Sequence, residues 1–196
     1  MLMTRPARQI FNQTNITNFV VDIPDSTRTS GFVLNAQTAP LPGVRIPVVE
    51  TVTGTMGLGR AMRAGTTFEY DPFIVRFIVD EDMTSWMNMY KWMLSTNNYI
   101  TGHNTAHSDG PEFVTLHILN NNKTEVVLTA NFYKPWISDL SEIEFSYTED
   151  SDPAVTCVAT IHYAYMTIEK DGEVIVSQQP RQAAESKSIS RHPSLR

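Results

Sequence analysis

The clearest pattern in the chain is an alternation of apolar residues that changes its period near Asp80. From Phe73 to Val79 every second residue is Phe or Val, which predicts a strand buried on at least one face. The apolar residues then recur at the i, i+3, i+4, i+7 spacing of an amphipathic helix, and Asp80 is placed to cap its first N–H groups. Glu81 and Asp82 are expected in the first turn, where the helix dipole favours negative charge. The predicted core face of the helix consists of Met83, Trp86, Met87, Tyr90 and Met93.

Shorter segments with the same alternation predict a mainly β protein. The further predicted strands are 16–23, 31–38, 44–55, 66–70, 112–119, 124–133, 143–147 and 154–169. Residues 97–110 are expected to form a polar loop, and residues 134–140 a connection. Seven or more strands with one helix predict a small β-barrel or sandwich of two sheets with one flanking α-helix. This domain is expected over 16–169, between an N-terminal extension, 1–15, and a C-terminal extension, 170–196.

Residues 47–70 are predicted to form a long hairpin with a flexible, Gly-rich tip. The tip, Gly54 to Ala61, is a near miss to a phosphate-binding loop, because Arg60 stands where a lysine is needed and Ala61 replaces a magnesium-binding hydroxyl. No helix follows to present its N-terminus to a phosphate. A hairpin tip is therefore favoured over a nucleotide site.

The sequence contains few other candidates for metal-binding or catalytic residues. His103 and His107, with Asp109 and Glu112, are zinc-ligand types, but a solvated polar loop is the favoured interpretation. The single cysteine, Cys157, allows no internal disulfide and is expected to be a buried strand residue. We expect no catalytic residue, cofactor or metal. A metal- or nucleotide-dependent enzyme remains an alternative, as does a peptide- or ligand-binding module built on the helix that carries Trp86 and Trp92.

The charge distribution argues against tight nucleic-acid binding. Residues 1–169 carry 10 Lys or Arg against 18 Asp or Glu, whereas residues 170–196 carry 5 against 3. An acidic body lacks the basic groups that displace phosphate counterions, although it can let DNA pass. No apolar run is long enough for a membrane span or a secretory signal, so we expect a cytoplasmic protein unless it joins a larger particle. Residues 177–196 have the composition of a segment that is ordered only when a neighbour holds it, which suggests an assembly.

The order of these elements resembles the tail tube protein family of long-tailed and contractile bacteriophages, which includes baseplate proteins that initiate the tube. The resemblance spans about Ile16 to Glu169. It is carried by Thr38 to Pro47, Tyr70 to Met93, Leu140 to Tyr147 and Val155 to Met166. The tube protein of type VI secretion resembles the same family in fold and is a further alternative, against which the two extensions weigh.

The resemblance implies a non-enzymatic virion protein, assembled in the bacterial cytoplasm, that forms a ring, expected to be a hexamer. The ring belongs to a tail tube or to its initiating ring at the baseplate, and it acts as a conduit for DNA ejection. The implied partners are further copies of the chain, adjacent tube or baseplate proteins, sheath and tape-measure proteins, and DNA as non-specific cargo, with no membrane. The hairpin would contact the neighbouring subunit and the next ring through Thr51, Thr53, Met56, Leu58, Arg60, Met62 and Arg63. The chain beyond Lys170 exceeds the family's usual core, which suggests a specialised ring at a baseplate or tube end.

Overall fold

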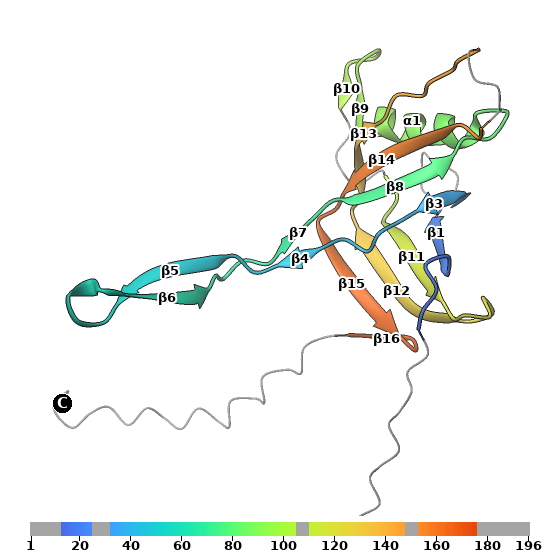
Figure 1. Ribbon diagram of the computed structural model, residues 1–196. Coiled ribbons are helices and arrows are strands. Elements are labelled where there is room, and N and C mark those ends of the chain that lie inside the picture. The colour runs from blue at the N-terminus through green and yellow to red at the C-terminus, as the bar shows by residue number, and fades with distance from the viewer. Residues whose placement is uncertain (1–12, 25–31, 105–109, 148–152, 176–196) are drawn as a thin grey trace, which may run out of the picture.

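The computed structural model describes residues 13–24, 32–104, 110–147 and 153–175. Most of the two predicted extensions, 1–15 and 170–196, lies outside these ranges, as do the candidate zinc ligands His107 and Asp109. Figure 1 shows a body of two sheets and one helix, from which a long hairpin projects to one side. The predicted mainly β fold, with two sheets, one helix and a long hairpin, is confirmed.

The larger sheet has six antiparallel strands in the order β16-β15-β12-β11-β1-β2. Their bounds are β1 Phe19–Ile23, β2 Phe32–Leu34, β11 Phe113–Leu119, β12 Val126–Tyr133, β15 Tyr165–Lys170 and β16 Glu173–Val174. The smaller sheet has four antiparallel strands in the order β13-β14-β8-β3. Their bounds are β3 Ala36–Thr38, β8 Phe73–Ile78, β13 Trp136–Leu140 and β14 Thr156–His162. A small ribbon, β9 Asn97–Asn98 with β10 His103–Asn104, occupies part of the predicted polar loop.

One hydrophobic core joins the two sheets. The alternation in β8 behaves as predicted, because Phe73, Val75 and Phe77 are buried while Ile74 and Arg76 are exposed. Phe73 stacks on Phe132 of the larger sheet with ring centroids 4.5 Å apart. The other core side chains are Val21, Ile23, Leu34, Met89, Trp92, Val114, Leu116, Ala130, Ile137, Cys157, Ala159 and Ile161.

Two predicted strands are each divided between the two sheets. The segment predicted as 31–38 breaks at Asn35 into β2 in the larger sheet and β3 in the smaller one. The segment predicted as 154–169 breaks at Tyr163 and Ala164 into β14 and β15. An apolar alternation reports which face is buried but not which sheet buries it, so the sequence could not locate these bends.

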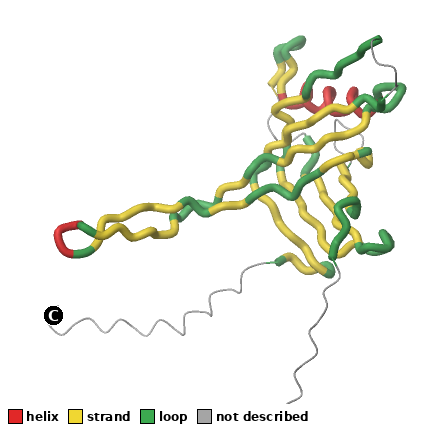
Figure 2. The backbone as a smooth tube through the Cα atoms, in the orientation of Figure 1, coloured by secondary structure: helices red, strands yellow, loops and turns green. Residues whose placement is uncertain are grey.

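The connection predicted at 134–140 is wrong, because it contains strand β13. The register shift between Ile137 and Asp139 interrupts the alternation there and hides the strand. Conversely, the strand predicted over 143–147 belongs to no sheet in the described part of the chain, although its residues alternate as a strand would. Figure 2 shows this segment as a loop that leaves the body after β13.

Helix α1, Thr84–Thr96, packs along β13, but its buried face is rotated from the predicted one. The buried residues are Met89 and Trp92, while Met87, predicted as core, is 42% exposed. Met83, Trp86, Tyr90 and Met93 are only partly buried. Met and aromatic residues cover more than half of the circumference of this helix, and only the side with Thr84, Asn88 and Lys91 lacks them, so spacing alone could not select the buried face.

The helix also begins later than predicted, because Met83 adopts a left-handed backbone conformation with φ 54°. Glu81 and Asp82 therefore lie in the preceding turn and not in the first helical turn. The capping role of Asp80 is confirmed: its carboxylate accepts hydrogen bonds from the backbone N–H groups of Thr84, at 2.9 Å, and Ser85, at 2.8 Å. A hydrogen bond from the Ser85 hydroxyl, together with these two backbone bonds, holds the pKa of Asp80 well below its ordinary value.

Candidate assembly surfaces

The long hairpin is anchored to the body at its base. Strands β4, Val44–Arg45, and β7, Glu69–Tyr70, pair there, and the Arg45 guanidinium contacts the Glu69 carboxylate at 2.7 Å. The Tyr163 hydroxyl, at the bend between β14 and β15, donates a 2.8 Å hydrogen bond to the Asp71 carbonyl. Burial of this hydroxyl raises the pKa of Tyr163 to about 12. The base is therefore held by the same bend that joins the two sheets.

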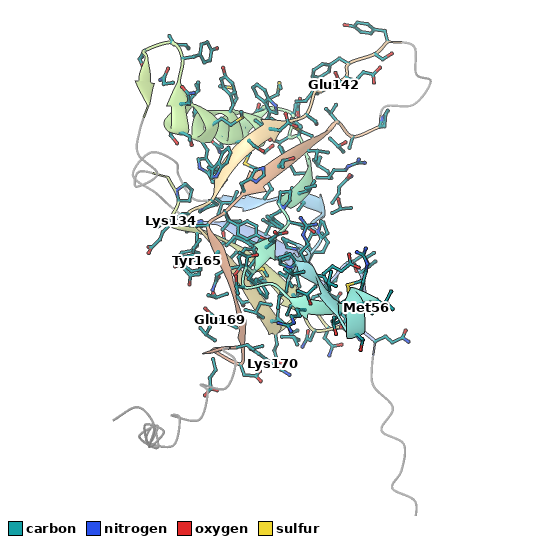
Figure 3. All side chains as sticks on the ribbon, turned by 90° about the vertical axis from the view of Figure 1, so that its left-hand side faces the viewer. Met56, Lys134, Glu142, Tyr165, Glu169 and Lys170 are labelled. Atoms are coloured by element: carbon teal, nitrogen blue, oxygen red, sulfur yellow. The ribbon has the colours of Figure 1, made fainter. Side chains whose placement is uncertain are left out.

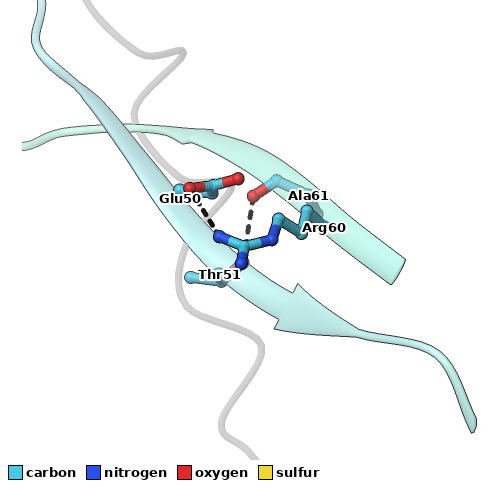
Figure 4. A network of polar contacts seen from close by, with 4 residues as sticks. All are labelled: Glu50, Thr51, Arg60 and Ala61. Carbon is cyan, nitrogen blue, oxygen red and sulfur yellow. Dashed lines mark hydrogen bonds and ion pairs between the residues drawn. The ribbon is translucent and has the colours of Figure 1, made fainter. Parts of the chain in front are cut away.

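Beyond the base, the hairpin is a two-stranded ribbon of β5, Val48–Thr53, and β6, Gly59–Ala64. Two polar contacts tie the strands together, as Figure 4 shows: Arg60 Nη1 donates to Glu50 Oε2 at 3.0 Å, and Thr51 Oγ1 donates to the Ala61 carbonyl at 3.3 Å. The tip is a short 3-10 turn, η1, Thr55–Gly57. Gly54, with φ 82°, allows the sharp entry into this turn.

The two faces of the ribbon differ in chemistry. Side chains alternate between faces, so one face presents an apolar row of Val48, Val52 and Met62, together with the Glu50–Arg60 ion pair. The apolar row is strongly exposed, with Met62 at 71%. The opposite face presents Thr51, Thr53 and Arg63 together with Val49, which lies beside Arg63 and is 49% exposed. Arg63 has no ion pair within the described residues.

All seven hairpin residues predicted to reach neighbouring subunits lie in or next to this ribbon. Met56 and Leu58 are at the tip, 92% and 87% exposed, and Thr51, Thr53, Arg60, Met62 and Arg63 lie on its strands. An isolated two-stranded ribbon is only marginally stable in water. This ribbon, exposed on both faces, is therefore chemically suited to being covered by another molecule.

A second candidate surface, which sequence reasoning missed, is the face of the six-stranded sheet that points away from the core, where Thr115 and Asn131 are buried and Glu169 is half-buried. Cross-strand register aligns polar side chains there, and Asn131 Nδ2 donates to Glu169 Oε1 at 2.7 Å. Thr115 Oγ1 donates to Asn131 Oδ1 at 3.1 Å, and His117 Nδ1 lies 3.1 Å from Thr129 Oγ1. We call this set of residues the polar ladder. In Figure 3 Glu169 is labelled on β15, near the end of that strand.

The polar ladder ends in aromatic residues and contains no lysine or arginine among its described members. Tyr133 stacks on Tyr165 with ring centroids 4.6 Å apart, and Phe113 lies 6.0 Å from Tyr133. Asp22, opposite Thr115 in the register, adds a further carboxylate. In the sequence, this face is represented by the polar residues that alternate with apolar residues in each strand. Only the strand order shows that the polar residues of the separate strands lie side by side on one face of the sheet.

Of the two candidates for enzymatic chemistry, the zinc candidate includes His107 and Asp109, which lie outside the described residues, and the phosphate-loop candidate gains no support from the geometry. The described residues contain no group of three or more His, Cys, Asp or Glu side chains placed to hold a metal ion. Residues 54–58 form the hairpin tip and Gly59 to Ala61 begin strand β6, so the segment resembling a phosphate-binding loop is remote from any helix N-terminus in the described part of the fold. Cys157 is buried, burial raises the pKa of its thiol, and Ser141 contacts it. Across the same residues, no helix is long and apolar enough to span a membrane.

Comparison with known proteins identifies the relatives of this chain. Residues 15–167 match the family described as T4-like virus tail tube protein gp19. The chain is 66% identical over 173 residues to the tail tube terminator protein of Enterobacteria phage T4, covering 88% of this chain and 98% of that protein.

Solved structures resemble the chain in fold. The tube terminating cap of the anti-feeding prophage gives a TM-score of 0.62 at 15% identity, covering 87% of this chain and 99% of that one. The sheath/tube terminator of an extracellular contractile injection system gives 0.60 at 13% identity, covering 82% and 99%. A crystal structure of an Hcp protein gives 0.50 at 13% identity, covering 78% and 92%. At these identities the likeness concerns the fold alone.

Proposed function

This chain belongs to the T4-like virus tail tube protein family, and from that premise we propose that it is a tube terminator, closing one end of a phage tail tube as a ring of identical copies. Membership makes it a structural, non-enzymatic component of the phage tail. The observation that carries the finer proposal is the 66% identity, over nearly the whole length of both chains, to a protein named as a tube terminator. That name favours a tube end over the bulk tube and over the initiating ring at the baseplate. The sequence had suggested a specialised ring at either a baseplate or a tube end.

The geometry supports a ring-forming role. The hairpin exposes apolar residues on a two-stranded ribbon that is only marginally stable by itself. The two sheets also end in short edge strands, such as β2 and β3. Joining copies edge to edge would cover both features, and closing the ring would remove the open edges. Six copies is the expected number, by analogy with the family.

The polar ladder is the proposed lumen face of the ring. A channel for DNA must avoid attraction to phosphate, and this face carries Asp22 and Glu169 with no Lys or Arg among its described residues. The contact between Asn131 and Glu169 fixes one carboxylate in the sheet surface. Ejected DNA would thus pass a wall that it does not bind.

The direct test uses tail tubes assembled from the tube protein of the same phage without this chain. When the purified full-length chain is added, negative-stain electron microscopy should show one extra ring at one end of each tube, and further addition of tube protein should no longer lengthen that end. Incorporation along the length of the tube would contradict a terminator and favour a bulk subunit. No binding to either end would refute the proposed function.

A control variant tests whether the hairpin is responsible. Replacing Met56 and Leu58 by Ser removes the two most exposed apolar residues of the tip, and it should weaken ring formation or capping while the far-UV circular dichroism stays unchanged. The same replacement at the exposed apolar residues Val126 and Val127, which begin strand β12 of the six-stranded sheet and do not belong to the hairpin, provides the control.

A further inference from the structure

The segment that follows β13 has the pattern of a strand but lies in no sheet. We call residues 142–147 the acidic arm. Ile143, Phe145 and Tyr147 alternate with Glu142, Glu144 and Ser146, as in a strand with one apolar and one polar face. Ile143 packs against the core of its own chain, whereas Phe145 is 71% exposed and Tyr147 is fully exposed. Two large aromatic side chains are thus held in water at the end of an anchored segment.

The acidic arm matches the ribbon in two respects, apolar pattern and charge. The ribbon has one apolar face, with Val48, Val52 and Met62, which matches the Phe145 and Tyr147 side of the arm. Its other face carries Arg63, which has no ion pair among the described residues, and this matches the Glu142 and Glu144 side. Arg60 forms an ion pair with Glu50 on the apolar face. The positive charge of Arg63 is therefore the one left to pair with glutamates, and it lies on the opposite face.

The backbone of the ribbon is also suited to such a partner. Strand β6 pairs only with β5, so its outer edge carries unpaired N–H and C=O groups within the described fold. An added strand would satisfy that edge and convert a marginal two-stranded ribbon into a three-stranded sheet. Beyond Ile143, which packs on its own core, residues 144–147 of the arm are exposed and can pair along part of β6, Gly59–Ala64.

The two surfaces cannot meet within one chain. Met56 at the hairpin tip and Glu142 at the start of the arm lie far apart in the view of Figure 3, and Figure 1 shows the hairpin projecting from the side opposite to the segment after β13. In a cyclic ring each copy contacts its neighbour through two different patches on opposite sides. The hairpin and the acidic arm lie on opposite sides of the chain, as two such patches would.

We propose that the acidic arm of one copy adds as a third strand to β6 of the hairpin of the next copy, with Glu142 and Glu144 facing Arg63 and with Phe145 and Tyr147 covering the Val48, Val52 and Met62 row. The occupant is a second copy of this chain, chosen for this complementarity of charge and apolar pattern. The inference rests on the proposed ring function and specifies one of its contacts.

Cross-linking between copies tests the proposal. Arg63→Cys and Glu144→Cys chains are co-expressed, assembled and treated with a short bis-maleimide; buried Cys157 is the only other thiol. The expected product is a covalent dimer that contains one chain of each variant and that neither variant forms by itself. A dimer of Arg63→Cys chains alone would mean that hairpins contact each other and would overturn the proposal.

Charge exchange supplies an independent readout in native mass spectra of the full-length chain. Arg63→Glu should reduce the ring population, Glu144→Arg should do the same, and the double variant should recover it. Lys123→Glu, which makes the same charge change in the exposed turn after β11, should leave rings intact and serves as the control.

The outcomes separate this contact from the ring itself. If the unmodified chain forms rings or caps tubes but shows neither the mixed cross-link nor the recovery, the arm contact is refuted and the terminator function stands. If the unmodified chain neither forms rings nor caps tubes, the proposed function fails, and this inference fails with it.

Discussion

The rotated face of helix α1 leads to a quantitative prediction. Trp92 is 1% exposed, whereas Met87, five residues earlier, is 42% exposed. A buried Trp side chain removes roughly 150–250 Å² from water, worth about 4–6 kcal/mol at ~25 cal/mol per Å². Measured Trp→Ala costs in cores are about 3–5 kcal/mol, so we expect Trp92→Ala to lower the free energy of unfolding by that amount. Met87→Ala should cost less than about 1 kcal/mol, because the side chain is largely in water and Ala favours helix.

The assay is thermal and urea unfolding followed by far-UV circular dichroism. For a chain of this length a change of 1 kcal/mol shifts the melting temperature by about 2–4 °C, so Trp92→Ala should lower it by roughly 6–20 °C and Met87→Ala by less than about 4 °C. Both variants must be compared at one low protein concentration, because ring formation would add stability by mass action. Equal losses for the two variants would refute the assignment of the buried face and restore the face predicted from spacing.

Three further predictions concern single groups. Tyr163→Phe removes the hydrogen bond to the Asp71 carbonyl and should cost about 0.5–1.5 kcal/mol. Because the folded-state pKa of Tyr163 is raised to about 12, its contribution should be complete below pH 10 and should decline as pH rises toward 12, measured by urea unfolding across that range. Asp80 has a lowered pKa, so wild type should be more stable than Asp80→Ala above about pH 4, and this difference in the free energy of unfolding should disappear as pH falls further. A difference that became larger in acid would contradict the capping role. Cys157 should resist alkylation in the native protein and react once urea unfolds it, as mass spectrometry of the labelled chain would show; rapid native labelling would mean that the strand is not buried as described.

Several elements were readable from the sequence because they depend on local chemistry. The alternation from Phe73 to Val79 needs only one buried face, and β8 follows it residue by residue. The glycine at position 54 and the Val- and Thr-rich strands around it predicted the hairpin, since turn geometry and strand propensity are local. Asp80 was identified as a cap because a carboxylate just before a helix has N–H donors within reach.

Other features depended on partners distant in the chain. Asn35 and Tyr163 give no local sign that the chain changes sheets there, because burial on one face is the same whichever sheet supplies it. The face of α1 was decided by its packing along β13, a strand that its bulge had hidden.

The sequence by itself determined the kind of protein: strands, one helix, a hairpin and the pattern that resembles tail tube proteins. These features depend on the positions of apolar residues and on local turn geometry, which can be read along the chain. The tertiary structure decided which surfaces are left for assembly. The polar ladder arises only when β1, β11, β12 and β15 lie side by side, and 142–147 stands out only because no described strand pairs with it. Pairing is a long-range property, since a strand's hydrogen-bond partners are chosen by the whole fold and not by its own residues.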